Sequence, residues 1–194
     1  MKKNLIVDCF AGGGGASVGI EMALGRPVDI AINHDPDAIL MHKTNHPNTL
    51  HLTEDIFKVN LRKYVKDQHV ALMWASPDCT SHSKAKGGKP RERGLRILPW
   101  AVYKHAKEIL PDVILMENVE EIQQWGPLDE KGYPIPERKG EDYRKNKRRI
   151  SLYHPISRRD AGRGLERAAF NGADQDDRHF KPVRVGDCVC HKVL

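Results

Sequence analysis

The sequence has no apolar run long enough to cross a membrane, and its 194 residues include only four cysteines and 6% aromatic residues. A membrane-spanning helix needs about 20 consecutive apolar residues, so we expect no membrane span. The apolar run that follows Met-Lys-Lys is too short for the hydrophobic part of a secretory signal peptide, and it ends in an acid. We therefore expect a cytoplasmic protein.

The cysteines do not form the pattern of a disulfide-stabilised secreted domain. Cys9 and Cys79 are far apart, and Cys188 and Cys190 lie near the end of the sequence. Small secreted domains carry many more cysteines for their length. Cys188, Cys190 and His191 resemble half of a metal site, but no second half stands elsewhere in the sequence. We expect no metal centre.

Positive charge is concentrated in one part of the chain. The net charge is +6, and residues 1–83 are nearly neutral, with 8 basic and 9 acidic residues. Residues 84–149 hold 16 basic and 11 acidic residues. A basic segment favours an anionic partner such as nucleic acid, although charge alone is explained equally well by a solvated surface.

Short apolar runs alternate with helix-like stretches in the first two thirds of the chain. The apolar runs do not alternate with polar residues, which is typical of strands covered on both faces; they lie at residues 4–10, 28–33, 70–75 and 113–117. The helix-like stretches lie at residues 16–24, 36–46, 95–110 and 120–125. With a short extra strand before Thr53, this order predicts an α/β fold with a doubly wound, mainly parallel sheet.

The pattern changes after Trp125. Residues 126–140 contain three prolines and three glycines, which predicts a loop, and residues 144–149 form a basic run. The tail has few apolar clusters, and it is either weakly ordered or a foreign or frame-altered end. We expect a core at residues 1–125, a Pro/Gly-rich and basic linker at 126–149, and a tail at 150–194.

A glycine-rich turn follows the first predicted strand. Residues 8–17 read Asp-Cys-Phe-Ala-Gly-Gly-Gly-Gly-Ala-Ser. Ligands of open α/β sheets bind beyond the carboxyl ends of the strands, and glycine lets the backbone approach a ligand closely. Ser17 stands where the full dinucleotide fingerprint has its third glycine. The turn favours a nucleotide-like cofactor, although any tight strand-to-helix turn can use glycine.

Two acids follow the next two predicted strands. Asp35 comes about 20 residues after the glycine turn, a spacing that suits hydrogen bonding to ribose hydroxyls. It also precedes Pro36 at a helix start and can cap that helix, and we prefer it to His34 as the ribose partner. Asp55 is either an ordinary surface acid or an acceptor for an adenine amino group.

A cysteine and a glutamate follow two later strands. Cys79 lies in the polar sequence Ser-Pro-Asp-Cys-Thr-Ser-His-Ser, which favours a loop over a buried structural cysteine. A cysteine in such a loop can act as a nucleophile when its thiolate is stabilised. Glu117 ends the run at residues 113–117, and a partly buried glutamate can hold a proton at neutral pH and act as a general acid. Both side chains are expected at the same sheet edge.

Six basic residues lie within residues 84–96, interleaved with three glycines. This composition predicts a mobile loop that closes on phosphates. The loop directly follows Cys79, so the predicted nucleophile and the predicted phosphate contacts are neighbours along the chain.

The order and spacing of these features resemble the C5-cytosine DNA methyltransferases. Residues 8–15 are similar to the cofactor motif of that family, residues 76–79 to its Pro-Cys nucleophile motif, and residues 117–119 keep its Glu-Asn-Val motif intact. The resemblance covers about residues 3–145. It implies a Rossmann-like, S-adenosylmethionine-dependent methyltransferase fold that is incomplete at its C-terminal end.

The resemblance implies a role for each matching residue. Cys79 would attack C6 of a cytosine flipped out of double-stranded DNA, Glu117 would protonate or hydrogen-bond N3, and Asn118 would hold the loop or the base. Phe10 would stack on the adenine of S-adenosylmethionine. Further cofactor contacts would come from Gly12, Gly14, Gly15, Asp35, Asp55 and Pro77, and nucleic-acid contacts from Ser83, Lys84, Lys86, Lys89, Arg91 and Arg93.

The sequence departs from the family pattern in three ways. Asp78 stands where the family has proline, and Asp35 where it has glutamate. The later family elements are not found: a Gln-Arg-x-Arg-like motif, of which residues 175–178 are a faint echo, the target-recognition region, and a C-terminal Asn-containing motif. The chain therefore resembles half of a methyltransferase followed by an unrelated tail.

Several functions fit this resemblance. The chain is either an active, DNA-associated methyltransferase of bacterial or phage type, as in restriction-modification, completed by a second polypeptide, or a silent fragment that binds cofactor or nucleic acid. RNA cytosine is a further substrate for the same chemistry. A dehydrogenase-like nucleotide-binding domain is disfavoured, because it leaves Cys79 and Glu117 without a joint purpose.

Overall fold

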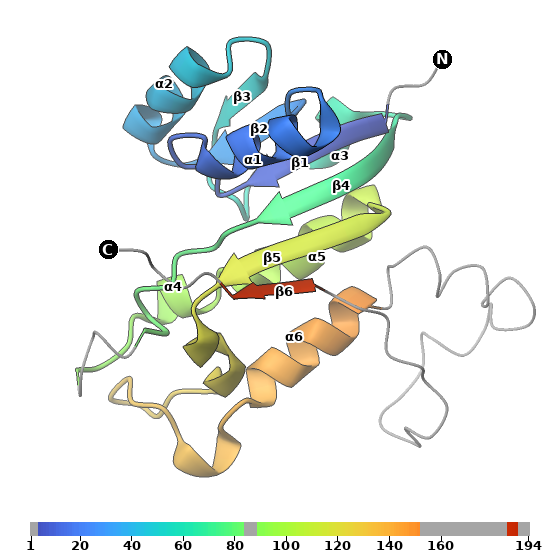
Figure 1. Cartoon of the computed structure of the whole chain (residues 1–194). Helices are drawn as coiled ribbons and strands as arrows, with labels where there is room; N and C mark the ends of the chain where they lie inside the picture. The colour runs from blue at the N-terminus through green and yellow to red at the C-terminus, as the bar shows by residue number, and fades with distance from the viewer. Residues whose placement is uncertain (1–3, 84–88, 152–185, 190–194) are drawn as a thin grey trace, which may run out of the picture.

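The computed structural model describes residues 4–83, 89–151 and 186–189, the last four without their side chains. Its strands form one parallel sheet in the order β3-β2-β1-β4-β5-β6 (Figure 1). This confirms the predicted doubly wound sheet, whose strand order reverses between β1 and β4. The strands are β1 (Asn4–Cys9), β2 (Ile30–Asn33), β3 (Leu50–Thr53), β4 (His69–Ala75), β5 (Val113–Asn118) and β6 (Gly186–Val189).

Helices cover both faces of the sheet (Figure 1). One face carries α1 (Gly15–Leu24) and α2 (Pro36–Asn45), and the other carries α3 (Leu61–Val65) and α5 (Pro99–Ile109). The short helix α4 (Arg93–Arg96) precedes α5, so the single helix predicted at residues 95–110 is two helices. Pro99 explains the break: proline has no amide hydrogen to donate and is tolerated in the first turn of a helix.

Strand β1 packs on both sides, which explains the unbroken apolar run at its residues 5–7. Leu5 and Val7 belong to the main core, together with residues of α3 and α5. Ile6 points to the other face, where it packs with Ile20 of α1 and with Val28. Successive side chains of a strand point to opposite faces, so both sets must be apolar when both faces are covered.

The face that carries α1 is less well covered where β4 and β5 pair. Leu72 of β4 lies beside Val113 of β5, and Trp74 lies beside Leu115. Val113 is 44% exposed and the other three side chains are half-buried, whereas Met73 on the opposite face is buried. An apolar strip of partly exposed side chains therefore runs along β4 and β5.

The segment predicted as a linker contains regular structure. It begins after η2 (Glu120–Gln124) and holds the 3-10 turn η3 (Pro136–Arg138) and helix α6 (Glu141–Ser151), which crosses the predicted boundary at residues 149/150. Glu141 forms ion pairs with Arg138 and Lys145. Asn146 and Ile150 are buried, and the Asn146 amide donates a hydrogen bond of 3.0 Å to the carbonyl of Pro99.

Most of the predicted tail, including residues 175–178, lies outside the described residues. The exceptions are the end of α6 and β6, a strand that the sequence does not predict. Within the described part of the chain, no helix combines the length and the apolar character that crossing a membrane requires.

Candidate active site

A cavity of about 630 Å³ lies at the carboxyl ends of the first four strands. This is where an open α/β sheet binds its ligands, and the volume lies within the roughly 300–1,000 Å³ typical of small-molecule sites. Its wall is largely apolar, with a few polar groups. The lining side chains include Phe10 after β1, Asn33 and His34 after β2, Asp55, Ile56 and Phe57 after β3, and Ser76 and Asp78 after β4.

Phe10 reaches the cavity with an unusual backbone conformation. Its φ angle is 65°, a region that non-glycine residues rarely adopt. The amide of the next residue, Ala11, donates a hydrogen bond of 2.9 Å to the carbonyl of Ile32, which ties the end of β1 to β2. The aromatic ring therefore occupies the cavity wall at a conformational cost, a feature that clusters at functional sites.

The glycines of the turn serve the packing of α2. Gly14 has a φ angle of 105°, and a Cβ atom there would lie 2.6 Å from Nε2 of His46. A Cβ atom at Gly13 would collide with Met41. Gly12 and Gly15 have no neighbour within 4 Å at the Cβ position. None of the three predicted cofactor glycines, Gly12, Gly14 and Gly15, lines the cavity.

The two acids predicted to bind the cofactor lie in different settings. Asp35 is the N-cap of α2, and its carboxylate accepts a hydrogen bond of 2.9 Å from the amide of Asp37. The sequence favours Asp35 over His34 as the ribose partner, but His34 is the one of the two that lines the cavity. Asp55 also lines it, and its carboxylate accepts a hydrogen bond of 2.8 Å from the amide of Phe57.

Cys79 lies in a tight turn after β4. Its carbonyl oxygen accepts hydrogen bonds of 2.9 Å from the amides of His82 and Ser83, and its thiol is half-buried and forms no disulfide. The carboxylate of Asp78 accepts hydrogen bonds from both the amide and the hydroxyl of Thr80. The negative charge of Asp78 is thus engaged in shaping the turn beside Cys79.

The end of β5 is tied directly to this turn. The side-chain amide of Asn118 is buried and donates a hydrogen bond of 2.8 Å to the carbonyl of Pro77, two residues before Cys79. Glu117 precedes Asn118, and burial raises the pKa of its carboxyl group. Pro77 itself is not among the residues that line the large cavity. The structure therefore joins the segments that carry Cys79 and Glu117.

Arg96 has a structural role that its place in the sequence does not indicate. The sequence predicts it among the cations of a mobile basic loop, and this prediction is wrong because Arg96 is buried in α4. Its guanidinium donates hydrogen bonds of 3.1 Å to the carbonyl of Ser81 and 3.2 Å to that of Gly126. The sequence alone does not distinguish a buried arginine that hydrogen-bonds to loop carbonyls from an exposed one.

The remaining predicted nucleic-acid contacts are only partly described. Lys84 and Lys86 lie outside the described residues, and Lys89 is exposed. Arg91 donates a hydrogen bond of 3.0 Å to the carbonyl of Ser83, and Arg93 donates to the carbonyl of Asp129. These two arginines shape the loop by bonding to backbone.

The candidate metal ligands at the end of the sequence are not described. Cys190 and His191 lie outside the described residues, and the side chain of Cys188 in β6 is likewise not described. Among the residues that the structure does describe, no group of three or more histidine, cysteine or acidic side chains could hold a metal ion.

A chain of buried polar side chains lies beneath the glycine turn. The Ser17 hydroxyl donates to the carboxylate of Asp8 at 2.8 Å and lies 3.0 Å from Nε2 of His42, whose Nδ1 is 2.9 Å from Nε2 of His51. Burial raises the pKa of Asp8 to about 6 and, with neighbouring histidines, lowers that of His42 to about 4. The spacing of these residues in the sequence gives no sign of this network.

Together these features define a doubly wound α/β domain with a nucleotide-sized cavity beside a loop cysteine. Residues 5–125 match the C-5 cytosine-specific DNA methylase family. Because this match covers more than half of the chain, the chain belongs to that family.

Two relatives illustrate the similarity. The type II methyltransferase M.AquIA of Picosynechococcus sp. is 29% identical over 132 residues, which cover 64% of this chain and 52% of the relative. A crystal structure described as a DNA modification methyltransferase encoded within an E. coli prophage has a TM-score of 0.57 and 24% identity, over 78% of this chain and 37% of that one. The chain thus spans about half the length of the curated relative and shares the fold of the prophage protein.

Proposed function

We propose that this chain carries the cofactor-binding and nucleophile half of an enzyme that transfers a methyl group from S-adenosylmethionine to C5 of cytosine in DNA. The observation that supports this most strongly is the hydrogen bond from Asn118 to Pro77. It joins the segment of Cys79 to the segment of Glu117, and these are the two groups that the chemistry needs on one base.

The large cavity fits S-adenosylmethionine. Its volume of about 630 Å³ and its apolar wall suit a nucleoside, and acidic and imidazole groups lie at its rim. Phe10 would pack on the adenine ring, Asp55 would accept from the adenine amino group, and His34, with Asp35 beside it, would face the ribose. When bound, S-adenosylmethionine supplies an electrophilic methyl group.

Cys79 and Glu117 would act on opposite sides of the cytosine ring. The thiolate of Cys79 adds to C6 and forms a carbon–sulfur bond, which turns C5 into a nucleophile. Glu117 donates a proton or a hydrogen bond to N3 and so takes up the charge that develops on the ring; its raised pKa favours the protonated form. Once C5 carries the methyl group, loss of the C5 proton breaks the bond to C6 and frees Cys79.

The substrate would be a cytosine flipped out of double-stranded DNA. A base inside the stack cannot be reached by a side chain that attacks C6, so the base must leave the duplex. Ser83 and the lysines at positions 84, 86 and 89 would contact phosphates, while Arg91 and Arg93 hold the loop in shape through their bonds to backbone carbonyls.

A second polypeptide would complete the enzyme. The chain spans 52% of the length of its curated relative, and a second polypeptide would supply the target-recognition region and the later motifs that this sequence does not show. The apolar strip on β4 and β5 offers a place for it, because parallel sheets are normally covered on both faces. Trp74 supports this location, since its indole nitrogen is buried without a hydrogen-bond partner and needs an acceptor.

The direct test is product analysis. Duplex DNA is incubated with isotope-labelled S-adenosylmethionine and the chain, alone or with a co-expressed second polypeptide, and the nucleosides are identified by mass spectrometry. We expect 5-methylcytosine, and none with Cys79→Ser. Label on cytosine N4 or on adenine would contradict the proposal. The absence of product in both settings would favour a silent fragment, and label on RNA alone would change the substrate.

A further inference from the structure

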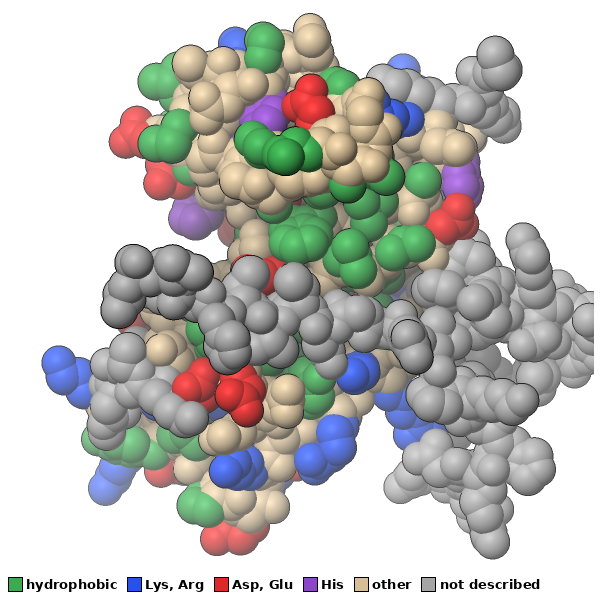
Figure 2. Space-filling view, viewed as in Figure 1, with side chains coloured by type: hydrophobic (Ala, Val, Ile, Leu, Met, Phe, Trp, Pro, Cys, Tyr) green, Lys and Arg blue, Asp and Glu red, His purple; other side chains and the backbone are tan. Residues whose placement is uncertain are grey.

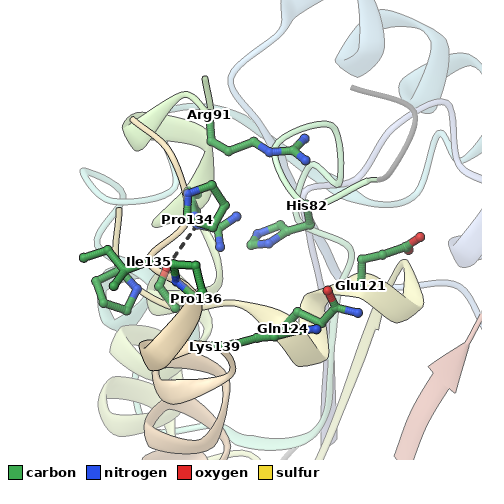
Figure 3. A pocket seen from close by; sticks show the side chains of 11 residues that line it. His82, Arg91, Glu121, Gln124, Pro134, Ile135, Pro136 and Lys139 are labelled. Carbon is green, nitrogen blue, oxygen red and sulfur yellow. Dashed lines mark hydrogen bonds between the residues drawn. The ribbon is translucent and has the colours of Figure 1, made fainter. Parts of the chain in front are cut away.

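A second cavity, of about 180 Å³, lies on the other side of the Cys79 turn and shares no lining residue with the large one. It is enclosed by the turn after β4, by α4, by η2 and by the segment at residues 126–139 (Figure 3). Three prolines form one wall. The mechanism proposed for Cys79 and Glu117 makes no use of this cavity.

His82 is directed into this cavity. The side chain is only 5% exposed, yet both ring nitrogens are buried and have no hydrogen-bond partner. Figure 3 shows the ring pointing into the space between Arg91, Pro134 and Gln124. Trp125 contacts the ring edge-on, with 5.8 Å between the ring centroids, and so fixes its orientation. A buried polar group without a partner is costly, so the ring is placed for a ligand or for ordered water.

The charges around His82 favour an anion. Among the described residues that line the cavity, Arg91, Arg96 and Lys139 are cationic and Glu121 is acidic. Outside the lining, Asp78 acts on His82 and Asp142 acts on Arg96, so these two carboxylates partly offset the positive charge. Arg96 is buried and holds its position through two backbone carbonyls, so its positive charge is fixed beside the cavity. Figure 2 shows lysine and arginine side chains over the lower half of the molecule, with acidic side chains between them.

We propose that this cavity is a binding site for a phosphate-type oxyanion, with His82 as its central contact. Neutral His82 offers one N–H donor to the anion, and a second donor forms when the ring takes up a proton. Gln124 adds an amide group at the rim. The anion is either a backbone phosphate of nucleic acid or a small free phosphate compound, because both present the same oxygens. The site is independent of the proposed methyl transfer.

Proton uptake gives the site a signature that water would not produce. Burial, followed by the charges of Arg96 and Arg91, lowers the pKa of His82 from 6.5 to about 4. A bound anion offsets these effects and raises the pKa of His82, so by linkage anion affinity must increase as the pH falls. Sulfate is a suitable probe because its own charge does not change over this range.

The test is sulfate titration of isotope-labelled protein, with the ring nitrogens of His82 followed by NMR. We expect saturable shifts, a higher pKa for His82 in sulfate, and binding about 10-fold or more weaker in His82→Phe, the size expected for a lost hydrogen bond to a charged group. His69→Gln, at the opposite end of β4, is the matched control and should bind as the wild type does. Unmoved His82 resonances, or equal sulfate affinity in His82→Phe, would overturn the proposal.

Two further arms identify the source of the anion. If a short DNA duplex displaces sulfate from His82, the natural anion is a backbone phosphate. If DNA leaves the sulfate in place but inorganic phosphate displaces it, the natural anion is a small free phosphate compound. If His82→Phe does not fold, the sulfate titration of the wild-type protein still tests the proposal, because the shifts of the His82 resonances are measured without a variant. An unchanged pKa of His82 at saturating sulfate would leave ordered water as the occupant and would refute the site.

Discussion

The side-chain amide of Asn118 donates a hydrogen bond of 2.8 Å to the carbonyl oxygen of Pro77. This bond spans the two strand ends that carry Glu117 and Cys79, and it is buried. It ties the end of β5 to the turn after β4, the two segments that carry the side chains to which we assign the proposed chemistry.

Asn118→Ala tests that relation. The change leaves the carbonyl of Pro77 buried without a donor, so the free energy of unfolding should fall by about 1–3 kcal/mol. Asn146→Ala is a matched control, because Asn146 also donates a buried hydrogen bond to a proline carbonyl, that of Pro99. Denaturation should show similar losses in both variants. Thiol labelling mapped by mass spectrometry should change at Cys79 only in Asn118→Ala; equal changes would contradict the role of the bond.

Phe10 provides a test of the cofactor site. Phe10→Ala should weaken binding of S-adenosylmethionine by about 1–2 kcal/mol, as expected for one aromatic contact and its burial. Phe10→Gly should bind equally weakly but be about 1 kcal/mol more stable than Phe10→Ala, since glycine adopts the φ angle of 65° without strain. Calorimetry measures the first effect and thermal unfolding the second. Unchanged affinity in both variants would remove the assignment.

The buried carboxyl group of Asp8 makes stability depend on pH. Its pKa is raised from 3.8 to about 6, so the folded state holds this proton more tightly than the unfolded state does. The resulting stabilisation is present below the unfolded value and is lost as the pH rises through the folded one. Across this window the wild type should lose about 3 kcal/mol relative to Asp8→Asn. Asp67→Asn, an exposed site, is the control, and parallel pH profiles for wild type and Asp8→Asn would contradict the burial argument.

DNA association should show a modest dependence on salt. The sequence alone allows six cations in residues 84–96, but Arg91, Arg93 and Arg96 donate to backbone carbonyls. The three lysines of this segment give a log–log slope of about −3 and no sequence preference without a partner. Lys89→Ala should make the slope shallower by about 0.9. A wild-type slope near −5, measured by titration at several salt concentrations, would show that the arginines also contact phosphates, as they would if a DNA phosphate occupied the cavity beside His82.

The sequence predicts well those features that arise from local pattern. The apolar run at residues 5–7 of β1 reflects burial on both faces, and the run at 113–116 marks β5, whose α1 side is only partly covered, so strands and sheet type follow directly. Helix α6 was missed because its polar side chains dominate and only two apolar positions, Tyr143 and Ile150, face the core. The periodicity that identifies an amphipathic helix is too weak there.

The candidate site was predicted in its outline but not in its detail. Cys79 and Glu117 were placed at one sheet edge because parallel strands end together. Asp35 caps α2, which leaves His34 to line the cavity. The two residues are adjacent in the sequence, so their spacing from the glycine turn cannot tell which one faces the cavity. Arg96 and His82 depend on contacts with Gly126 and Trp125, about thirty or more residues away, and no local pattern reports such contacts.

The most direct test of the proposed chemistry is covalent trapping with DNA that contains 5-fluorocytosine. Fluorine cannot leave C5 as a proton, so after methyl transfer the base should remain bonded to the protein. The account predicts an adduct that requires S-adenosylmethionine, maps to Cys79 by peptide mass spectrometry, is absent in Cys79→Ser, and forms about 10²–10⁴-fold more slowly in Glu117→Gln. The measurement is made with the chain alone and with the second polypeptide. An adduct that maps to another residue, or that survives Cys79→Ser, would contradict the account.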